Sequence, residues 1–246
     1  MHDVWHFSIS ESQIALVARN INDVGFGVLP DVLSEADLQL LRQTIFEAEE
    51  APQERYERLQ KNGTWVGTAL EVLPRSPSFV SLCQKICAFG MGTASQDTSF
   101  YQVFRCLQGD VAQKHSYLFH YDTYVLTVLV PIIIPEEGMR GDLLLFPNTR
   151  PIRRTYVHNL LDKTLVDNPL SRKLLRLAAI GKRMGVTTVR LRPGNLYLFW
   201  GYRTIHANEP CDPNKTRATA LIHFCDPYRG SKMRALLRSV RRLKSA

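Results

Sequence analysis

The chain has 246 residues, 45% of them hydrophobic and 22% charged, which is ordinary for a soluble globular protein and enough to bury one full core. Its longest apolar run, Val125 to Ile134, is interrupted by Thr127 and Pro131 and is too short to cross a bilayer, and the first residues lack the basic start and apolar run of a signal peptide. The net charge of +8 indicates an anionic partner, so we expect one cytoplasmic domain, residues 1–246, that binds an anion.

Helical patterns dominate the N-terminal part, residues 1–95, which we expect to support the rest of the domain. Residues 24–29 form a predicted strand. Ser34 is followed three residues later by an acidic residue, which resembles an N-cap, and the apolar spacing after it predicts a helix as far as about Arg58. A second helix is predicted near residues 79–89, after two prolines that break the chain.

Short apolar or alternating segments within residues 96–226 predict the strands of the core. Tyr124 to Ile134 is almost wholly apolar, as expected of a strand buried on both faces. The other predicted strands are residues 100–107, 143–146, 186–191, 196–200 and 217–224. Many short strands favour a mainly β protein with flanking helices, built as a double-stranded β-helix, that is, a jelly-roll or cupin-like barrel of two packed sheets.

A basic helical insert, residues 150–185, separates two of these strands. Between Arg150 and Arg192 there are eleven Lys or Arg residues and only two Asp residues. Residues 168–184 have apolar side chains at helical spacing, namely Leu170, Leu174, Leu177 and Ile180. Two interpretations stay open: a solvated helix that covers the barrel, or a lid or docking surface for anions.

The C-terminal tail, residues 229–246, predicts a basic amphipathic helix. From Ser231 onwards, apolar residues at 3.6-residue spacing lie opposite a face that carries only basic residues. This helix either docks on the body of the domain or lies in the surface of an anionic membrane. The docked helix leaves the expected location cytoplasmic, and the interfacial helix adds peripheral contact of the tail with the inner membrane face, so both interpretations stay open.

The cysteines are odd in number and form no Cys-x-x-Cys pair, so we expect reduced core thiols in a cytosolic protein. A zinc site of Cys and His residues is an alternative with little support from the spacing. The five cysteines are Cys83, Cys87, Cys106, Cys211 and Cys225.

A metal-binding pattern is the most informative feature of the chain. His120 and Asp122 lie two residues apart, so in an extended backbone both side chains leave on the same side. His206, brought in from a distant strand, would complete a two-His, one-carboxylate triad, which suits Fe(II) and leaves coordination positions open. Arg217 follows after ten intervening residues, and Thr219 lies two residues further on. Each residue alone has an ordinary structural explanation, but their order and spacing together predict a metal site.

This order and spacing resembles the signature of the Fe(II)/2-oxoglutarate-dependent oxygenases, and the surrounding segments are most similar to the phytanoyl-CoA dioxygenase-like branch. Three segments carry that likeness, Gly25 to Ser34, Gly141 to Asn148 and Arg192 to Phe199. The resemblance runs from about Gly25 to Asp226 and departs from the family in the two basic segments.

The resemblance implies Fe(II), 2-oxoglutarate and O2 as metal, cosubstrate and oxidant, with His120, Asp122 and His206 as catalytic metal ligands. It implies that Arg217 binds the distal carboxylate of 2-oxoglutarate bidentately. Thr219 shares the side-chain direction of Arg217 in a strand and can add a hydrogen bond, although it could also be an ordinary strand former.

Further candidates rest on position alone. Thr127 is polar inside a buried run, so it is a second cosubstrate candidate, unless nearby backbone satisfies its hydroxyl. Tyr117, Gln102 and Arg105 could reach the cosubstrate or the substrate. Trp200 is a substrate candidate that packing would explain equally well, and the neighbouring Gly201 would allow close backbone approach to the metal.

The function expected is hydroxylation of an unactivated C–H bond in an anionic small-molecule, lipid-linked or glycolipid substrate, for example a Kdo-type lipopolysaccharide sugar. A nucleic-acid demethylase of the same fold is one alternative, but relatives of that kind carry a second Arg six residues after the first, where this chain has His223. Nucleic acid is therefore not the expected partner. A non-enzymatic cupin-like binding module is the other alternative, and the intact triad speaks against it.

Overall fold

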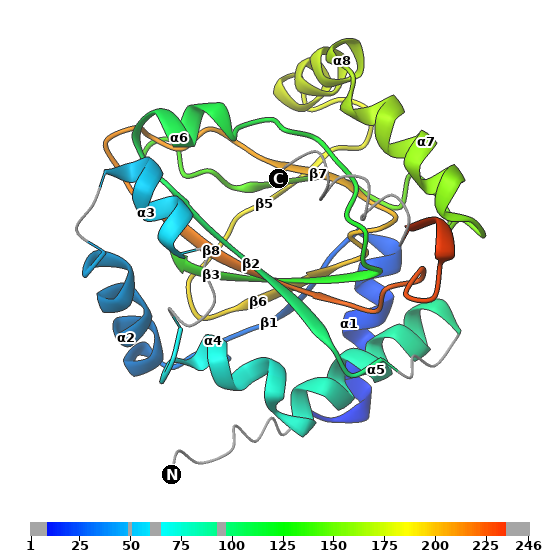
Figure 1. Ribbon diagram of the computed structural model, residues 1–246, viewed down its shortest axis with the longest axis horizontal. Coiled ribbons are helices and arrows are strands. Elements are labelled where there is room, and N and C mark those ends of the chain that lie inside the picture. The colour runs from blue at the N-terminus through cyan, green and yellow to red at the C-terminus, as the bar shows by residue number, and fades with distance from the viewer. Residues whose placement is uncertain (1–8, 49–50, 60–64, 93–96, 235–246) are drawn as a thin grey trace.

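A computed structural model of the protein describes residues 9–48, 51–59, 65–92 and 97–234, and places two antiparallel sheets inside a shell of helices (Figure 1). The larger sheet has the order β1-β6-β3-β8-β2, and the smaller sheet has the order β5-β4-β7. The strands of the larger sheet are β1 (Gly27–Leu29), β2 (Phe100–Leu107), β3 (Leu126–Ile133), β6 (Leu196–Phe199) and β8 (Arg217–Phe224). Those of the smaller sheet are β4 (Leu143–Phe146), β5 (Thr187–Val189) and β7 (Ile205–Asn208).

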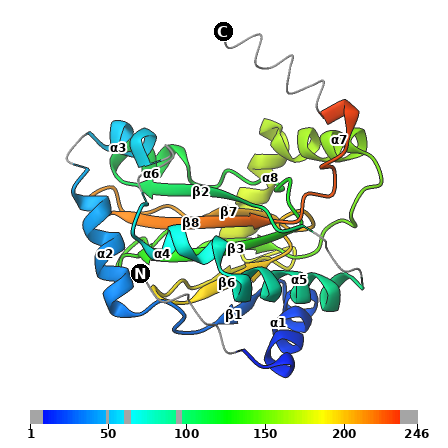
Figure 2. The same ribbon diagram turned by 60° about the horizontal axis from the view of Figure 1, so that its bottom comes forward.

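The outer face of the larger sheet is covered by N-terminal helices (Figure 2). These are α1 (Glu11–Asp23), α2 (Glu35–Phe46), α4 (Ala69–Val72), the 3-10 helix η1 (Leu73–Arg75) and α5 (Pro77–Met91). Ser34 caps α2 as expected, because its hydroxyl accepts from the backbone N–H of Asp37, whose carboxylate in turn accepts from the backbone N–H of Ser34. Two short helices, α3 (Pro52–Leu59) and α6 (Gly109–Lys114), lie beside the end of β2.

The outer face of the smaller sheet is covered by a helical pair, α7 (Tyr156–Asp167) and α8 (Pro169–Ile180). Thr155 caps α7 through a hydrogen bond from the backbone N–H of His158. Asn168 ends α7 and caps α8, whose first residue is a proline, so the two helices are joined at one extended residue. Leu175, Ala178 and Ala179 of α8 then pack against the smaller sheet.

The predicted architecture of two packed sheets with flanking helices is confirmed. The strand pairing among the described residues gives two separate sheets and does not close them into a continuous barrel. Several details were wrong. Helical residues outnumber strand residues in the described ranges, so the description as mainly β understates the helices. The helix expected to reach Arg58 ends at Phe46, and Pro52 starts a separate helix, since proline fits the first turn but not the interior of a helix. Helix α7 and strand β7 were not predicted as separate elements.

All five cysteines are free thiols; four of them are buried and Cys225 is half-buried. No helix in the described ranges is long and apolar enough to cross a membrane. Most of the predicted tail helix, residues 235–246, lies outside the described residues. The part that is described ends with Arg234, which is buried in an ion pair with Asp226 instead of belonging to an exposed basic face.

Candidate metal centre

The alternation of side chains along each strand sends one set of residues into the space between the two sheets. On β8, Arg217, Thr219 and His223 line a cavity there, while the intervening Ala218 and Ala220 face the helices. On β7, His206 faces the same cavity, and its neighbours on either side pack against the helical pair. The cavity of about 460 Å³ therefore collects residues that are far apart in the sequence.

His120 and His206 lie directly opposite each other in an isolated antiparallel bridge. The backbone N–H of His120 donates to the carbonyl of His206 at 3.1 Å, and the reciprocal bond is 3.0 Å. This pairing brings the two ring centroids to 4.4 Å. The segment with His120 thus reaches β7 without being a strand of either sheet, which is how two distant histidines come to face one point.

Both histidine rings are oriented by backbone carbonyls. Nδ1 of His120 lies 2.8 Å from the carbonyl oxygen of Leu118, and Nδ1 of His206 lies 3.1 Å from that of Thr204. If each Nδ1 carries the proton and donates, each Nε2 keeps a lone pair directed at the cavity. Nε2 of His206 is buried and has no hydrogen-bond partner within the described part of the chain. A buried nitrogen of this kind is costly unless a ligand satisfies it.

The carboxylate of Asp122 is fixed beside these nitrogens. Its Oδ2 accepts from the hydroxyl of Thr127 at 2.5 Å and lies 3.4 Å from Nε2 of His206, and its Oδ1 lies 3.7 Å from Nε2 of His120. Burial opposes ionisation of Asp122, but the three nearby histidine rings outweigh it and hold the pKa of the carboxyl well below its usual range. Asp122 therefore contributes a negative charge to the ligand set at neutral pH.

Protons do not compete with a metal ion for Nε2 of His120 at neutral pH. Desolvation at the cavity wall, together with the neighbouring His206, lowers the pKa of His120 to about 4. A group with a lowered basic pKa is neutral at pH 7, so its Nε2 lone pair is available as a ligand.

These three side chains fit a metal ion. One ligand atom from each lies within 4.8 Å of the other two, and this is the one such group of His, Cys, Asp and Glu residues in the described ranges. Two imidazoles and one carboxylate from this geometry form a facial triad with open positions, which is the donor set of non-haem Fe(II) oxygenases. The fold brings together the expected ligand set of His120, Asp122 and His206. Within the described ranges, no second cluster that contains cysteine could hold a metal ion.

Gly201 lies where no side chain fits. A Cβ atom at this position would lie 2.2 Å from Oγ1 of Thr127 and 2.3 Å from Oδ2 of Asp122, and the carbonyl of Gly201 accepts the backbone N–H of Asp122 at 2.9 Å. The close approach of backbone to the ligand carboxylate that the sequence suggested is therefore present.

Replacing Gly201 with alanine should displace the carboxylate of Asp122 and lower metal affinity by at least about tenfold, because outer residues that hold metal ligands commonly contribute this much. Metal binding by calorimetry measures the effect. Gly67→Ala is the matched control, since a Cβ there meets nothing within 4 Å, although its φ of +80° makes a small loss of stability expected. Equal metal affinity of the Gly201→Ala protein and its parent would contradict this assignment.

Arg217 is a buried cation at the other end of the cavity. Its Nε donates to the carbonyl of Gly141 at 2.7 Å, and its Nη1 donates to the hydroxyl of Thr219 at 3.3 Å. None of the salt bridges among the described residues involves Arg217, and burial lowers its pKa to about 10. A guanidinium enclosed without a carboxylate is a strong site for an anion, because a bidentate carboxylate would complete its hydrogen bonds. Thr219 accompanies it as expected from the shared strand face.

Thr127 has a different role from the one predicted, and Arg105 lies where it was predicted to lie. Thr127 is fully buried and holds Asp122, with His223 Nδ1 also 3.1 Å from its hydroxyl, so it positions a metal ligand and does not line the cavity as a cosubstrate contact. Arg105 does line the cavity, on the inward face of β2.

Three predicted residues are not brought to the site. Gln102 has the opposite side-chain direction to Arg105, and its amide donates to the carbonyl of Leu70 under the helices. Trp200 is fully buried in the core between sheet and helices, where its indole N–H donates to Asn22. Tyr117 lies beneath α8, with the guanidinium of Arg176 5.2 Å from its ring. The prediction that these three residues contact the cosubstrate or the substrate is therefore wrong, because none of them lines the cavity.

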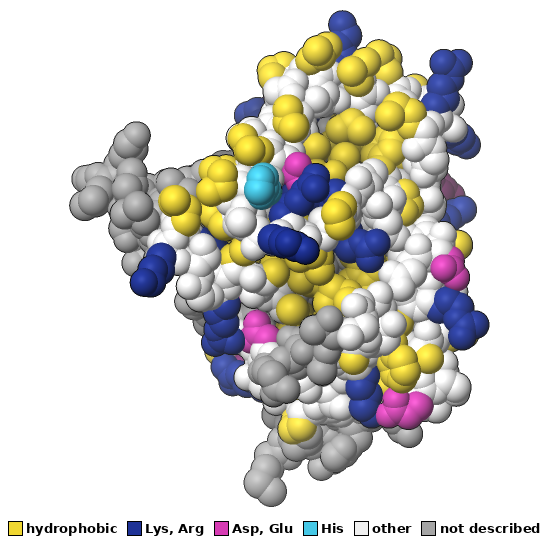
Figure 3. Space-filling model, turned by 90° about the vertical axis from the view of Figure 1, so that its right-hand side faces the viewer, with side chains coloured by type: hydrophobic (Ala, Val, Ile, Leu, Met, Phe, Trp, Pro, Cys, Tyr) yellow, Lys and Arg dark blue, Asp and Glu magenta, His cyan; other side chains and the backbone are white. Residues whose placement is uncertain are grey.

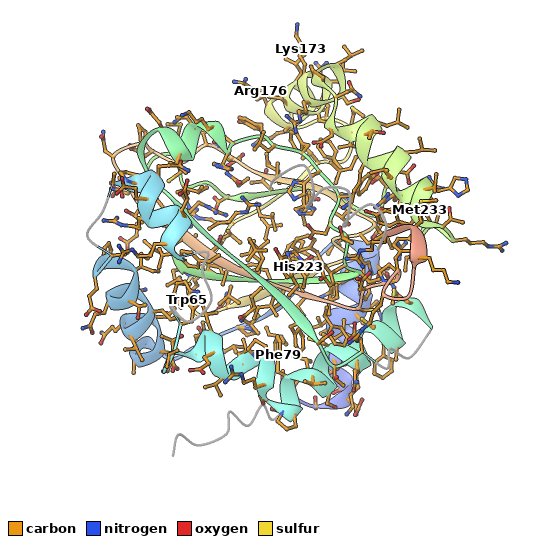
Figure 4. The ribbon with its side chains drawn as sticks, viewed as in Figure 1. Trp65, Phe79, Lys173, Arg176, His223 and Met233 are labelled. Atoms are coloured by element: carbon orange, nitrogen blue, oxygen red, sulfur yellow. The ribbon has the colours of Figure 1, made fainter. Side chains whose placement is uncertain are left out.

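Sequence reasoning missed several cavity residues. Lys163 of α7 projects to the cavity, its Nζ donates to the hydroxyl of Thr123 at 2.8 Å, and burial lowers its pKa to about 8. His115 and Arg172 also line the cavity. His223 lies in the interior, with its Nδ1 3.5 Å from Oδ2 of Asp122 (Figure 4). The basic charge of the insert was the one signal for Lys163 and Arg172.

No family model matches the chain, and no curated protein matches its sequence. Among solved structures it is similar to a prolyl-4-hydroxylase of Pseudomonas putida, with a TM-score of 0.54 and 13% identity over 89% of this chain and 98% of that chain. It is also similar to a prolyl 4-hydroxylase from Phytophthora capsici, with a TM-score of 0.54 and 14% identity over 93% of this chain and 69% of that chain. At such identities the likeness establishes a shared fold and does not establish a shared chemistry.

Proposed function

We propose that the protein is an Fe(II)- and 2-oxoglutarate-dependent dioxygenase that hydroxylates an unactivated C–H bond of an anionic substrate. The observation that carries this proposal is a single cavity with two complementary ends. At one end His120, Asp122 and His206 bring their ligand atoms within 4.8 Å of one another, and at the other end the buried Arg217 takes part in none of the salt bridges among the described residues. 2-Oxoglutarate is a dicarboxylate, so one molecule can satisfy both ends.

The protein's own part in this reaction is positioning and exclusion of water. Iron and 2-oxoglutarate, when bound, would supply the oxidising chemistry with O2 as the oxidant, which gives one oxygen atom to the succinate formed with release of CO2 and the other to the substrate. Arg217 and Thr219 orient the distal carboxylate of the cosubstrate. Thr127 fixes Asp122, and the apolar side chains of Leu129, Leu143 and Leu221 line the cavity between these groups.

The charge of the cavity supports an anionic substrate. Beyond Arg217, its lining includes Arg105, Lys163 and Arg172 as cations. The acidic residues of the lining are Asp122 and Asp167, of which the first is a proposed metal ligand and the second pairs with Arg172. Lys163 lines the cavity without a salt bridge to either of these acidic residues, and Arg105 lines it as well, so an anionic group of an incoming molecule would be held there.

Within that class we propose a small-molecule, lipid-linked or glycolipid substrate, as in the phytanoyl-CoA dioxygenase-like branch that the sequence resembles. A Kdo-type lipopolysaccharide sugar is one example, since it combines a carboxylate with a lipid anchor. The two alternatives are less well supported. The three metal-ligand side chains, any of which a non-enzymatic binding module could lack, are all present. Nucleic-acid demethylases of this fold carry a second arginine six residues after the first, where this chain has His223.

The proposal is tested by incubating the Fe(II)-loaded protein with 2-oxoglutarate, O2 and a panel of candidate substrates. The panel contains a Kdo-bearing lipid A precursor, an acyl-CoA, a methylated oligonucleotide and a proline-containing peptide. We expect succinate formation and a gain of one oxygen atom with an anionic lipid-linked or CoA-linked compound. Stimulation by the neutral peptide alone would contradict the substrate class, and failure to bind 2-oxoglutarate would contradict the whole proposal.

Lys163→Met should raise KM for the anionic substrate by about tenfold, since one charge-assisted contact is lost. The parent should lose affinity as pH rises through about 8, because Lys163 is cationic only below its pKa of about 8. The variant should lack this step in its profile of KM against pH. Lys85→Met, at an exposed ion pair on α5, is the control. A Lys163→Met protein with the parental KM and pH profile would remove Lys163 from substrate binding.

A further inference from the structure

The helical pair α7–α8 carries an apolar stripe on its outer side. We call this stripe the outer apolar face, and it consists of Val157, Leu161, Leu165, Leu170, Leu174, Leu177 and Ile180. These side chains are 46% to 67% exposed, although their spacing would ordinarily place them in a core. The helices instead bury their opposite sides, through residues such as Val166 and Leu175. Seven exposed apolar side chains gathered on two adjacent helices mark an interaction site.

Basic residues surround the outer apolar face. Figure 3 shows apolar side chains gathered over the upper part of this side of the molecule, with Lys and Arg side chains at the rim. Lys173 projects from the outer side of α8, away from the body of the protein (Figure 4). Lys182 and Arg183 follow directly after α8, and none of these three cations forms a salt bridge with a described carboxylate.

The acidic residues of the insert do not offset this charge. Asp162 is held by Arg150 at 3.0 Å and by Arg153 at 2.7 Å, and Asp167 is held by Arg172 at 2.6 Å. Each acid is thus engaged within the insert, and the eleven basic residues between positions 150 and 192 leave a large positive excess. Any partner of the outer apolar face therefore has to accept leucine side chains and positive charge together.

Charge decides between the possible partners. A second copy of the chain packed face to face would bring the same lysines and arginines against each other, which is unfavourable. The chain's own tail, residues 235–246, contains four basic residues and no acidic residue, so it would meet the same repulsion. Nucleic acid would satisfy the cations and leave the leucines in water. An anionic lipid surface accepts both, with leucines at the acyl boundary and cations among the headgroups.

We infer that the α7–α8 pair docks the protein on the surface of an anionic lipid bilayer through the outer apolar face and its basic rim. This assigns membrane contact to the insert, whereas the sequence had suggested the tail. The same two helices contribute Lys163, Asp167 and Arg172 to the cavity wall, so docking would hold the mouth of the cavity near the bilayer. That last consequence rests on the proposed function, while the docking surface does not.

Co-sedimentation with vesicles tests the inference in the full-length protein. Vesicles of phosphatidylcholine alone are compared with vesicles that also contain phosphatidylglycerol, each at low and high salt. We expect binding to the anionic vesicles that weakens with salt. The triple variant Leu170→Ser, Leu174→Ser, Leu177→Ser should bind at least about tenfold less, because the buried apolar area is lost. The double variant Lys173→Glu, Arg183→Glu should lose the preference for anionic lipid.

A matched control replaces two exposed leucines elsewhere, Leu16→Ser on α1 and Leu40→Ser on α2, and should bind like the parent. All variants change surface residues, so equal melting temperatures and equal 2-oxoglutarate turnover in solution establish that the fold and the cavity are intact. A chain truncated after Arg234 should still bind vesicles in a leucine-dependent manner.

Three results would overturn the inference. The parent could fail to sediment with anionic vesicles at low salt. The triple variant could bind like the parent while the truncated chain does not, which would return the membrane contact to the tail. Light scattering could instead detect a dimer that the triple variant breaks, without vesicle binding, which would make the outer apolar face a contact between two copies. None of these outcomes depends on whether the cavity binds iron.

Discussion

His206→Ala is expected to abolish stable metal binding and turnover. The substitution removes one of three ligands, and removal of a mere outer partner of a ligand already costs about 10–100-fold in affinity, so the loss should exceed about a hundredfold. The fold should persist, since the variant also removes a buried nitrogen that has no hydrogen-bond partner among the described residues. Calorimetric titration with Fe(II) or Mn(II) under anaerobic conditions measures the affinity.

Thermal unfolding gives a second readout for this variant. Metal that binds only the folded state should raise the melting temperature of the parent and leave that of His206→Ala unchanged. His158→Ala is the control, because His158 is exposed on α7 and contacts Thr155 instead of the cavity. If His206→Ala bound metal and consumed 2-oxoglutarate as the parent does, the triad assignment would be wrong.

Arg217→Ala should weaken 2-oxoglutarate binding and leave metal binding nearly intact. Loss of one partner of a buried, hydrogen-bonded charge pair costs about 2–5 kcal/mol, which is a change in Kd of about 30-fold to several thousandfold. The variant should also be less stable, because the carbonyl of Gly141 loses its hydrogen bond from Nε. Calorimetric titration of the metal-loaded protein with 2-oxoglutarate separates the cosubstrate effect from the metal effect.

Arg217→Lys distinguishes charge from geometry at this position. Lysine keeps the positive charge but lacks the planar fork that pairs with both oxygens of a carboxylate, so an intermediate affinity is expected. Equal affinity of the parent and of Arg217→Ala for 2-oxoglutarate would remove Arg217 from the cosubstrate site.

The candidate site was predictable wherever spacing translates directly into side-chain direction. Arg217 and Thr219 share a face two residues apart on β8, so their convergence follows from strand geometry. His120 and Asp122 have the same spacing in a segment outside the sheets, and both line the cavity. The prediction that Gln102 reaches the cosubstrate or the substrate was wrong because side chains alternate in direction along a strand. Both faces of β2 are largely apolar, and nothing in the sequence says which face meets the helices and which meets the cavity.

The roles of Thr127 and Lys163 needed three-dimensional contacts. A polar residue inside a buried run signals a function, but only the structure reveals that the hydroxyl of Thr127 is bound to Asp122. Lys163 belongs to a helix that periodicity did not separate from the rest of the insert, and its approach to the cavity depends on how α7 packs on the smaller sheet.

The insert departs most from sequence-based expectation. Apolar side chains at helical spacing ordinarily mark the buried side of a helix, yet Leu170, Leu174 and Leu177 are exposed. The side that packs on the smaller sheet carries Ala178 and Ala179, whose small side chains allow α8 to approach closely. The periodicity predicted the helix correctly and gave no information about which of two apolar sides faces inward.

The central claim, that one cavity binds Fe(II) and 2-oxoglutarate together, is tested most directly by an anaerobic absorption titration. Adding 2-oxoglutarate to the Fe(II)-loaded parent should produce a metal-to-ligand charge-transfer band that saturates at one equivalent. The band should be absent in Asp122→Ala and should require much more 2-oxoglutarate in Arg217→Ala. A parent protein that binds Fe(II) but develops no such band at saturating 2-oxoglutarate would contradict the account.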